Sequence, residues 1–156
     1  MIRPPETELL EFKDYTPSDY DNCLFLFDLN CPSFFAVEER ADYISFLETK
    51  QELYLLGRLG HEIVSAFGIE MGENRICGIA WLMVHPEYHR KGYGSEMMAF
   101  VLKYAHKHRI VKILLSTSQH SADFFEQFGA YETSRIENGW GVGMHRIDME
   151  IDLPAS

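Results

Sequence analysis

Long hydrophobic runs are missing from this sequence of 156 residues. No stretch approaches the roughly 18 consecutive apolar residues that a membrane-spanning helix needs. The first residues, Met1 to Glu8, hold two prolines and two acids and lack the apolar centre of a secretory signal. The sequence therefore predicts a cytoplasmic protein that does not associate with a membrane.

Cysteine is also scarce, and positive charge is outnumbered. The three cysteines, Cys23, Cys31 and Cys77, form no CxxC pair, which predicts reduced thiols and no metal centre. Fourteen Lys and Arg stand against 24 Asp and Glu, for a net charge of -10 at pH 7. A surface this acidic argues against nucleic acid as a partner and is compatible with a cationic small substrate.

The composition is that of a globular protein. Hydrophobic residues make up 46% and charged residues 24% of the chain, which excludes wholesale disorder, collagen-like repeats and a coiled coil. No linker, repeat or low-complexity tract divides the sequence. Residues 1–156 are therefore expected to form a single domain.

The hydrophobic pattern predicts the element order βααβββαβαββ. Strand and helix alternate only in the second half, so the expected fold class is α/β with a mixed sheet (α+β), not a doubly wound fold. Strands are expected at 9–15, 52–58, 62–71, 75–84, 111–116, 131–136 and 145–153, and helices at 16–30, 37–49, 95–108 and 121–128.

Two glycine-containing segments are informative. Residues 75–84 are almost continuously apolar, which predicts a central strand buried on both faces. Gly78 within it predicts a bulge or a close backbone approach. Residues 138–143, Asn-Gly-Trp-Gly-Val-Gly, predict a glycine-rich loop between the last two strands, with Trp140 placed to fold over a site.

The segment with the clearest chemistry is Val84-His-Pro-Glu-Tyr-His-Arg-Lys-Gly-Tyr-Gly-Ser95, between a buried strand and a helix. Gly92 and Gly94 permit positive φ and a close approach of the backbone to a ligand. Successive amides and the first turn of the helix favour a phosphate or pyrophosphate. Arg90 and Lys91 add positive charge. A P-loop is absent, and Met97 breaks the Rossmann GxGxxG pattern.

Read with the elements around it, this segment resembles the GNAT superfamily of acyl-CoA-dependent N-acyltransferases. That family carries Gln/Arg-x-x-Gly-x-Gly/Ala at a strand-to-helix turn, matched here by His89-Arg-Lys-Gly-Tyr-Gly94. Residues 121–129, Ser-Ala-Asp-Phe-Phe-Glu-Gln-Phe-Gly, resemble the family's later Ala-x-x-x-Tyr-Glu-x-x-Gly helix. The resemblance covers residues 76–131 and implies a mostly antiparallel, GNAT-like central sheet in which one parallel strand pair splays apart.

The resemblance also implies that acetyl-CoA is the co-substrate and that it lies in the splayed gap. Its pantetheine arm would pair with backbone near Leu82, Met83 and Val84, and its pyrophosphate would bind amides of His89, Arg90, Lys91, Gly92, Tyr93, Gly94 and Ser95. Ser118 would contact the cofactor arm or cap the helix that follows, and Phe125 would pack against the cofactor or the sheet. Two positions depart from the family pattern: His89 replaces Gln or Arg, and Phe125 replaces the tyrosine that protonates the leaving thiolate.

The catalytic base and the acceptor site stay open at the level of sequence. The strand from Cys77 to Val84 has no carboxylate, so the family's frequent glutamate is missing there. Candidate bases are Glu70, His85, His120 and Glu39, with a water chain as a further option. The acceptor is expected to contact an aromatic and acidic set from the first two helices and the last loop: Asp28, Asn30, Phe34, Phe35, Glu39 and Trp140.

The resulting expectation is an N-acetyltransferase that acts on a primary amine of a small molecule or peptide by direct attack. No cysteine has a histidine at motif spacing, which argues against an acyl-enzyme intermediate. The alternative is a non-catalytic acyl-CoA-binding sensor or regulatory module. The acceptor, the acyl length and the oligomeric state are not set by the sequence, and a homodimer is one option.

Overall fold

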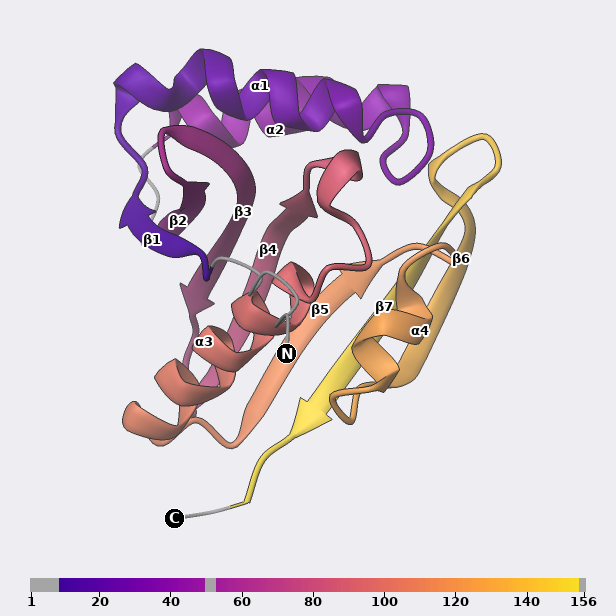
Figure 1. Ribbon diagram of the computed structural model, residues 1–156. Helices are drawn as coiled ribbons and strands as arrows, with labels where there is room; N and C mark the ends of the chain where they lie inside the picture. The colour runs from indigo at the N-terminus through magenta and orange to yellow at the C-terminus, as the bar shows by residue number, and fades with distance from the viewer. Residues whose placement is uncertain (1–8, 50–52, 155–156) are drawn as a thin grey trace, which may run out of the picture.

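The computed structural model describes residues 9–49 and 53–154. The expectations for Met1 to Glu8 and for the first residue of the strand predicted at 52–58 fall outside these residues. Within them, one sheet has the strand order β1-β2-β3-β4-β5-β7-β6 (Figure 1). The strands are β1 Glu11–Asp14, β2 Tyr54–Leu59, β3 Glu62–Met71, β4 Ile76–Val84, β5 Lys112–Thr117, β6 Tyr131–Gly141 and β7 Met144–Asp152.

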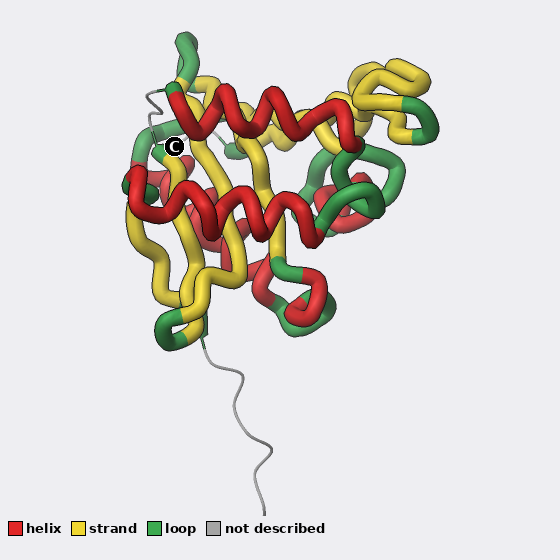
Figure 2. Tube along the Cα trace, turned by 90° about the horizontal axis from the view of Figure 1, so that it is seen from above, coloured by secondary structure: helices red, strands yellow, loops and turns green. Residues whose placement is uncertain are grey.

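Helices cover both faces of this sheet. They are α1 Tyr20–Leu29, α2 Arg40–Glu48, α3 Tyr93–Lys107 and α4 Ala122–Glu126, with short 3-10 turns η1 Pro17–Asp19, η2 Val37–Glu39 and η3 Pro86–Tyr88. Figure 2 views the molecule from the side of α1 and α2, which lie in front of the strands. The order of elements confirms the predicted βααβββαβαββ, and the fold is the expected mixed α/β one.

The two helical layers bury separate cores. Met97, Met98 and Val101 of α3 pack in one cluster with residues of the sheet and of α4. Phe27 of α1 and Tyr43 of α2 pack in a second cluster over β2, β3 and β4. The second layer does not extend over β5, β7 and β6, whose face on that side carries polar residues. No helix within 9–49 and 53–154 is long and apolar enough to cross a bilayer.

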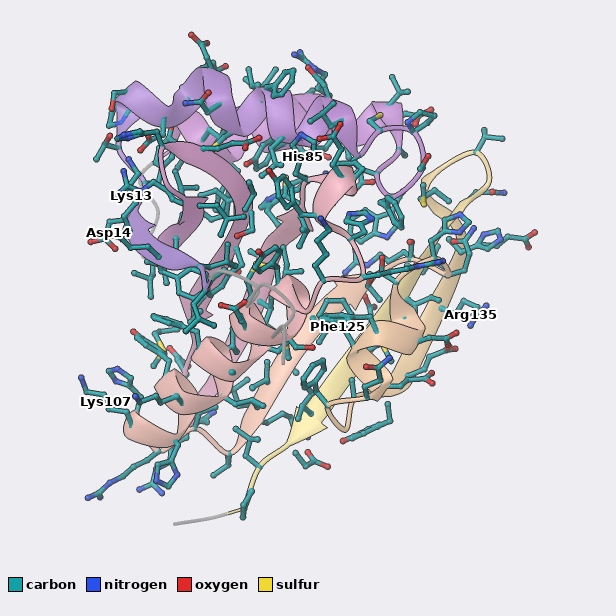
Figure 3. The ribbon with its side chains drawn as sticks, viewed as in Figure 1. Lys13, Asp14, His85, Lys107, Phe125 and Arg135 are labelled. Carbon is teal, nitrogen blue, oxygen red and sulfur yellow. The ribbon has the colours of Figure 1, made fainter. Side chains whose placement is uncertain are left out.

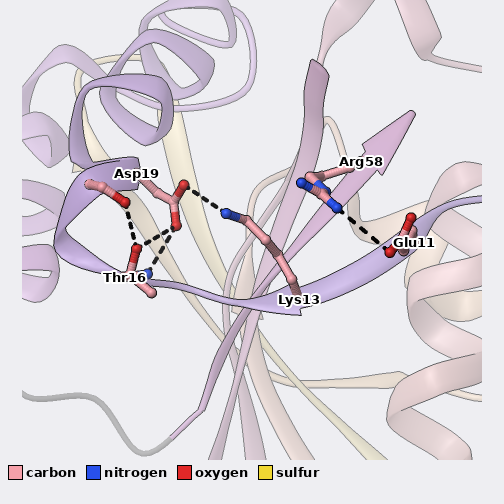
Figure 4. A network of polar contacts seen from close by, with 6 residues as sticks. Glu11, Lys13, Thr16, Asp19 and Arg58 are labelled. Carbon is pink, nitrogen blue, oxygen red and sulfur yellow. Dashed lines mark hydrogen bonds and ion pairs between the residues drawn. The ribbon is translucent and has the colours of Figure 1, made fainter. Parts of the chain in front are cut away.

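The entry to the first helix illustrates how local polar contacts set an element boundary. The Asp19 carboxylate accepts hydrogen bonds from the Thr16 backbone N–H at 3.0 Å and from Lys13 Nζ at 3.0 Å (Figure 4). Arg58 and Glu11 form a neighbouring ion pair at 3.6 Å. The Asp19 side chain therefore closes the 3-10 turn that precedes α1 by bonding back to the Thr16 backbone.

The strands β4 and β5 pair over only three residues. Their parallel register runs from Ile76–Lys112 to Gly78–Leu114, whereas β4 continues to Val84 and β5 to Thr117. Beyond Gly78 the two strands part, which forms the expected fork in the sheet. The carboxyl ends of β4 and β5 are therefore not hydrogen-bonded to each other.

Two expectations about glycine-containing segments are wrong. The bulge in β4 does not lie at Gly78: the register with β3 shifts by one residue around Trp81, which has a φ of 48°. Gly78 keeps regular pairing on both sides. The expected loop at residues 138–143 is shorter than predicted, because β6 continues to Gly141 and only Val142 and Gly143 form the turn before β7 begins at Met144. The register between β6 and β7 is irregular between Ile136 and Gly141, and Gly139 lies in this bulge. The segment therefore forms a long twisted hairpin.

Candidate functional site

A cleft of about 1130 Å³ opens where β4 and β5 part. Residues Ile76–Val84 of β4 and Leu114–Thr117 of β5 form its centre. One flank, here called the loop side, consists of the segment from Tyr88 to Ser95 together with α4. The opposite flank, the hairpin side, consists of the α1–α2 connection and the β6–β7 hairpin.

The loop side owes its shape to the main chain. Arg90 has a φ of 64° and Gly92 a φ of 88°, both in the left-handed region. Gly92 is the N-cap of α3, a helix of 15 residues, so the N–H groups of the first turn point toward the loop. His89 Nε2 lies 2.8 Å from the Val84 carbonyl oxygen, and its ring contacts Phe34 edge-on. The loop is thus fixed to the end of β4.

Gly94 serves a packing role. A Cβ on Gly94 would lie 2.9 Å from the ring of Phe124, too close for any real side chain. The glycine therefore lets the aromatic ring of α4 contact the first turn of α3. Both residues line the cleft, and the close approach of the Gly94 backbone to a ligand stays a prediction.

The predicted cofactor contacts mostly fall on this cleft. Lys91 and Tyr93 are not among its lining residues: Lys91 Nζ lies 5.4 Å from the centre of the Tyr88 ring, and Tyr93 is buried in a small core cluster. The expected residues that do line the cleft are Leu82, Met83, Val84, His89, Arg90, Gly92, Gly94, Ser95, Ser118 and Phe125.

Phe125 and Ser118 close the far end of the loop side. Phe125 is buried, packs in the core of α3 and α4, and contacts Phe124 edge-to-face at 5.0 Å (Figure 3). Ser118 Oγ accepts a hydrogen bond from the His120 backbone N–H at 3.2 Å. Ser118 therefore caps the turn that leads into α4, and the position of Phe125 offers no hydroxyl to the cleft.

Trp140 anchors the hairpin side. Its indole N–H donates a hydrogen bond to the Thr117 carbonyl oxygen at 2.8 Å, at the end of β5. Gln119 fixes the same hairpin through bonds to the Gly143 carbonyl (2.7 Å) and the His145 N–H (2.9 Å). Trp140 lines the cleft, as expected, but it does so from a strand held at several points, not from a loop.

Arg146 and Asp148 of β7 lie beside this tryptophan. The Arg146 guanidinium carbon is 5.3 Å from the centre of the Trp140 ring, and its Nε donates to Asp148 Oδ1 at 2.9 Å. Ser116 Oγ and Ser134 Oγ also donate to the Asp148 carboxylate, at 2.6 Å and 2.7 Å. Burial opposes ionisation of Asp148, but these hydrogen bonds hold its pKa below the ordinary value.

The α1–α2 connection supplies aromatic walls. Phe34 and Phe35 line the cleft, and the Phe35 ring lies 5.9 Å from that of Trp81. Asn30 also lines it, although its side-chain amide donates to the Leu26 carbonyl oxygen at 2.9 Å. Asp28 does not: its carboxylate pairs with Arg40 at 2.8 Å, outside the cleft lining.

Glu39 is the buried carboxylate of the hairpin side. It lines the cleft with 5% of its surface exposed, and its Oε2 accepts a hydrogen bond from the Ala36 backbone N–H at 2.7 Å. Burial raises its pKa to about 7, although the hydrogen bond from Ala36 acts in the opposite direction. A Cβ on Gly141 would collide with the Glu38 carboxylate, so the hairpin tip touches η2 and roofs the cleft here.

Of the other three candidate bases, Glu70 and His120 line the cleft and His85 does not. Glu70 on β3, opposite Gly78, and His120 after β5 both line the cleft with exposed side chains. His85 lies outside the lining, where its Nδ1 accepts a hydrogen bond from the Glu87 N–H at 3.1 Å (Figure 3).

Three residues that the sequence does not predict for the site, Trp81, Arg146 and Asp148, also line the cleft. Their place in the cleft depends on strand register, which local sequence patterns do not contain.

Comparisons with known proteins agree with this geometry. The model of the Acetyltransferase (GNAT) family matches residues 23–130. A search of curated proteins finds no match. Among solved structures, the ribosomal-protein-S18-alanine N-acetyltransferase from Escherichia coli superposes with a TM-score of 0.77 at 12% identity, over 95% of this chain and 96% of that one.

Two further structures are similar over nearly their whole length. Ard1 from Thermoplasma volcanium has a TM-score of 0.77 at 13% identity, covering 94% of this chain and 99% of its own. An aminoglycoside 6'-N-acetyltransferase complexed with coenzyme A has a TM-score of 0.73 at 14% identity, with 94% and 99% covered. At these identities the similarity shows a shared fold.

Proposed function

Because the chain belongs to the Acetyltransferase (GNAT) family, we propose that it transfers an acetyl group from acetyl-CoA to a primary amine of a small molecule or peptide. The observation that carries this proposal is the fork between β4 and β5, which opens into a cleft beside the loop at the start of α3. Structural neighbours in complex with coenzyme A, the aminoglycoside enzyme among them, support the choice of donor.

The loop side fits a pyrophosphate. Positive φ values at Arg90 and Gly92 turn the chain so that successive N–H groups converge ahead of α3, which adds the positive end of its dipole. The Arg90 side chain lines the same space. We assign the pyrophosphate to the amides from His89 to Ser95, with Arg90 as the neighbouring cation.

The unpaired edge of β4 fits an extended amide-bearing arm. Beyond Gly78 this edge has no strand partner on the side of β5, so main-chain groups of alternate residues near Leu82 and Val84 face the fork, although the Val84 carbonyl is already bonded to the His89 ring. Such an edge pairs readily with an extended chain, as a sheet edge does with a peptide. When bound there, acetyl-CoA supplies an activated acyl group with a thiolate as leaving group.

Glu39 is the proposed general base. An amine acceptor is protonated at neutral pH, since a lysine-like amine has a pKa near 10.4. A base with a pKa near the working pH accepts the proton best. Glu39 meets this requirement with its pKa of about 7 and its place in the cleft, whereas Glu70 and His120 are exposed. One of its carboxylate oxygens is bonded to Ala36, which leaves the other for the proton.

No dedicated acid is required for the leaving group. If the coenzyme A thiol resembles cysteine, its pKa of about 8.5 places the thiolate only about 2 kcal/mol above the thiol at pH 7. A thiolate can therefore leave without a proton and take one from water later. The phenylalanine at 125 is compatible with acetyl transfer on this basis.

Calorimetric titration with coenzyme A, followed by a thiol-release assay with acetyl-CoA over a panel of primary amines, tests the proposal. We expect micromolar binding of coenzyme A and amine-dependent thiol release. Failure to bind coenzyme A would contradict the proposed function. Binding without release above background for every amine would instead identify a sensor of acyl-CoA, the alternative that Phe125 favours because it removes the expected proton donor.

A further inference from the structure

Arg146 occupies a distinctive position on the hairpin side of the cleft. It belongs to β7, where its neighbour Ile147 pairs with Thr117, the last residue of β5. Ile147 is buried in the core under α3 and α4, so Arg146 faces the opposite side of the sheet, which the helical layer of α1 and α2 does not cover. Arg146 lines the cleft beside the end of β5.

The guanidinium of Arg146 is fixed from two directions. Its face lies over the Trp140 ring, which is itself held by the bond to Thr117. Its Nε is bonded to Asp148, whose carboxylate is held in turn by Ser116 and Ser134. Because the Trp140 contact and the Nε bond both restrain the side chain, less conformational freedom remains to be lost when a ligand binds.

The outer edge of the same guanidinium is free to bind. Its two Nη atoms make no hydrogen bond to the residues that the structure describes, while the side chain is 41% exposed on the cleft. Two parallel N–H donors in one plane match the two oxygens of a carboxylate. Asp148 accepts from Nε and from its two serine partners, so it orients the arginine without occupying this edge.

Three glutamates, Glu150, Glu70 and Glu39, also line the cleft. Glu150 is paired with Lys112 at 2.8 Å. Glu39 of η2 lies on the hairpin side as well, Glu70 lies on β3, and both carboxylates would favour an ammonium group. The cleft thus offers one oriented guanidinium on β7 and carboxylates on two other elements, an arrangement that suits a zwitterion.

We propose that Arg146 binds a carboxylate of the acceptor, so that the acceptor is an amine that carries a carboxylate group, of the amino acid class. This inference rests on the proposed acetyl transfer and names the substrate class of the same site. The aromatic rings of Trp140 and Phe35 then flank the rest of the acceptor, and the amine points toward the fork. Arg146 determines specificity and takes no part in moving a proton.

The test compares each acceptor with two analogues that lack the negative charge. Phenylalanine, methionine and glutamate are assayed for thiol release beside their α-amides and decarboxylated amines. We expect kcat/KM to be about 30-fold higher for the acids, the value for a charge-assisted bidentate contact. Arg146→Gln should remove that preference mainly through KM, with kcat little changed, and Arg146→Lys should retain part of it.

Arg135→Gln is the matched control. Arg135 also lies on the hairpin, but it is exposed, pairs with Glu132 at 2.8 Å and lies outside the cleft lining. This variant should keep the preference for acids unchanged. Coenzyme A titration on every variant reports whether the loop side is intact, and the preference of the unmodified protein is decisive even if Arg146→Gln does not fold.

The outcomes separate the two proposals. Thiol release that is equally fast with acids, amides and amines, or faster with peptides that have a free N-terminus, overturns the role of Arg146 and leaves acetyl transfer standing. An equal loss for acids and amines in Arg146→Gln overturns it as well. Absence of coenzyme A binding overturns both proposals.

Discussion

The two flanks of the cleft are built in different ways. The loop side is made of main chain: two residues with positive φ, the N–H groups at the start of α3, and a strand edge. The hairpin side is made of side chains that come from distant segments, such as Glu39, Trp140 and Arg146. A flank made of main chain keeps its binding groups when side chains are substituted. A flank made of side chains loses or changes a binding group with each substitution.

Under the proposed function, this difference suits the two flanks to separate tasks. A donor molecule that is the same in every turnover is suited to a flank that depends on backbone conformation. An acceptor must be distinguished from many similar amines, which requires specific side chains. Substitutions on the hairpin side should therefore alter acceptor parameters, and substitutions on the loop side should alter coenzyme A affinity.

The largest effect is expected at Glu39. Glu39→Gln should lower kcat about 100-fold or more, the usual contribution of a general base, while coenzyme A affinity stays the same. In the unmodified protein kcat should rise with pH up to about 7, and the variant should lack this step. Asp21→Asn, an exposed acid on α1, is the control. A variant with unchanged kcat would leave Glu70 or His120 as the base.

The same substitution changes the pH dependence of stability. Burial raises the pKa of folded Glu39 from 4.5 to about 7, so the folded state holds a proton that the unfolded state has lost between these values. Stability should therefore fall as pH rises through this window, by about 3 kcal/mol at most. Glu39→Gln keeps an oxygen for the Ala36 N–H and should lack this decline in thermal unfolding.

A smaller effect is expected on the loop side at Gly92. Gly92→Val forces a branched side chain into a φ of 88°, which costs about 1–3 kcal/mol or displaces the amides. Coenzyme A affinity should fall about 10- to 100-fold in calorimetry. Gly60→Val is the matched control, because Gly60 also has a positive φ (60°) and open space around it but lies on the β2–β3 turn. Equal losses in both variants would mean general destabilisation.

The asymmetry of the flanks also explains what the sequence could predict. The loop side was predictable because glycines indicate the local backbone conformation. Gly92 adopts a positive φ, and β4 and β5 part beyond Gly78, ahead of the loop that carries the motif. The fold was predictable for a similar reason, since each element has its own hydrophobic period. The contact of Gly94 with Phe124 was not predictable in this way, because it joins two helices that are distant in sequence.

The hairpin side was less predictable. Arg146 reaches the cleft only because β7 pairs with β5 in one register, and a shift of one residue would turn it into the core. Asp28 was expected in the cleft because aromatic residues surround it in sequence, but Arg40 on the next helix pairs with it instead. Such contacts depend on tertiary packing and leave no local pattern.

A still smaller effect should follow from removal of one anchor of the hairpin. Trp140→Phe keeps an aromatic ring and loses the hydrogen bond to Thr117, which should cost about 1 kcal/mol of stability. We expect the acceptor KM to rise about fivefold, with coenzyme A affinity unchanged. Tyr131→Phe is the control. Tyr131 lies on β6, like Trp140, and its hydroxyl donates a hydrogen bond to Asp152 of β7, so loss of that bond should leave KM unaffected. A changed coenzyme A affinity in Trp140→Phe would contradict the separation of the flanks.

The smallest effect is expected at Phe125, the one loop-side position where a side chain could have taken part in the reaction. Phe125→Tyr restores the hydroxyl that resembling proteins place here, yet the thiolate leaves readily without it, so kcat should change less than about threefold. Phe128→Tyr, outside the cleft lining, controls for the added hydroxyl. A rise of about tenfold that disappears above the thiol pKa of about 8.5 would show that proton donation limits the rate. The loop side would then depend on a side chain too, and its division of labour with the hairpin side would fail.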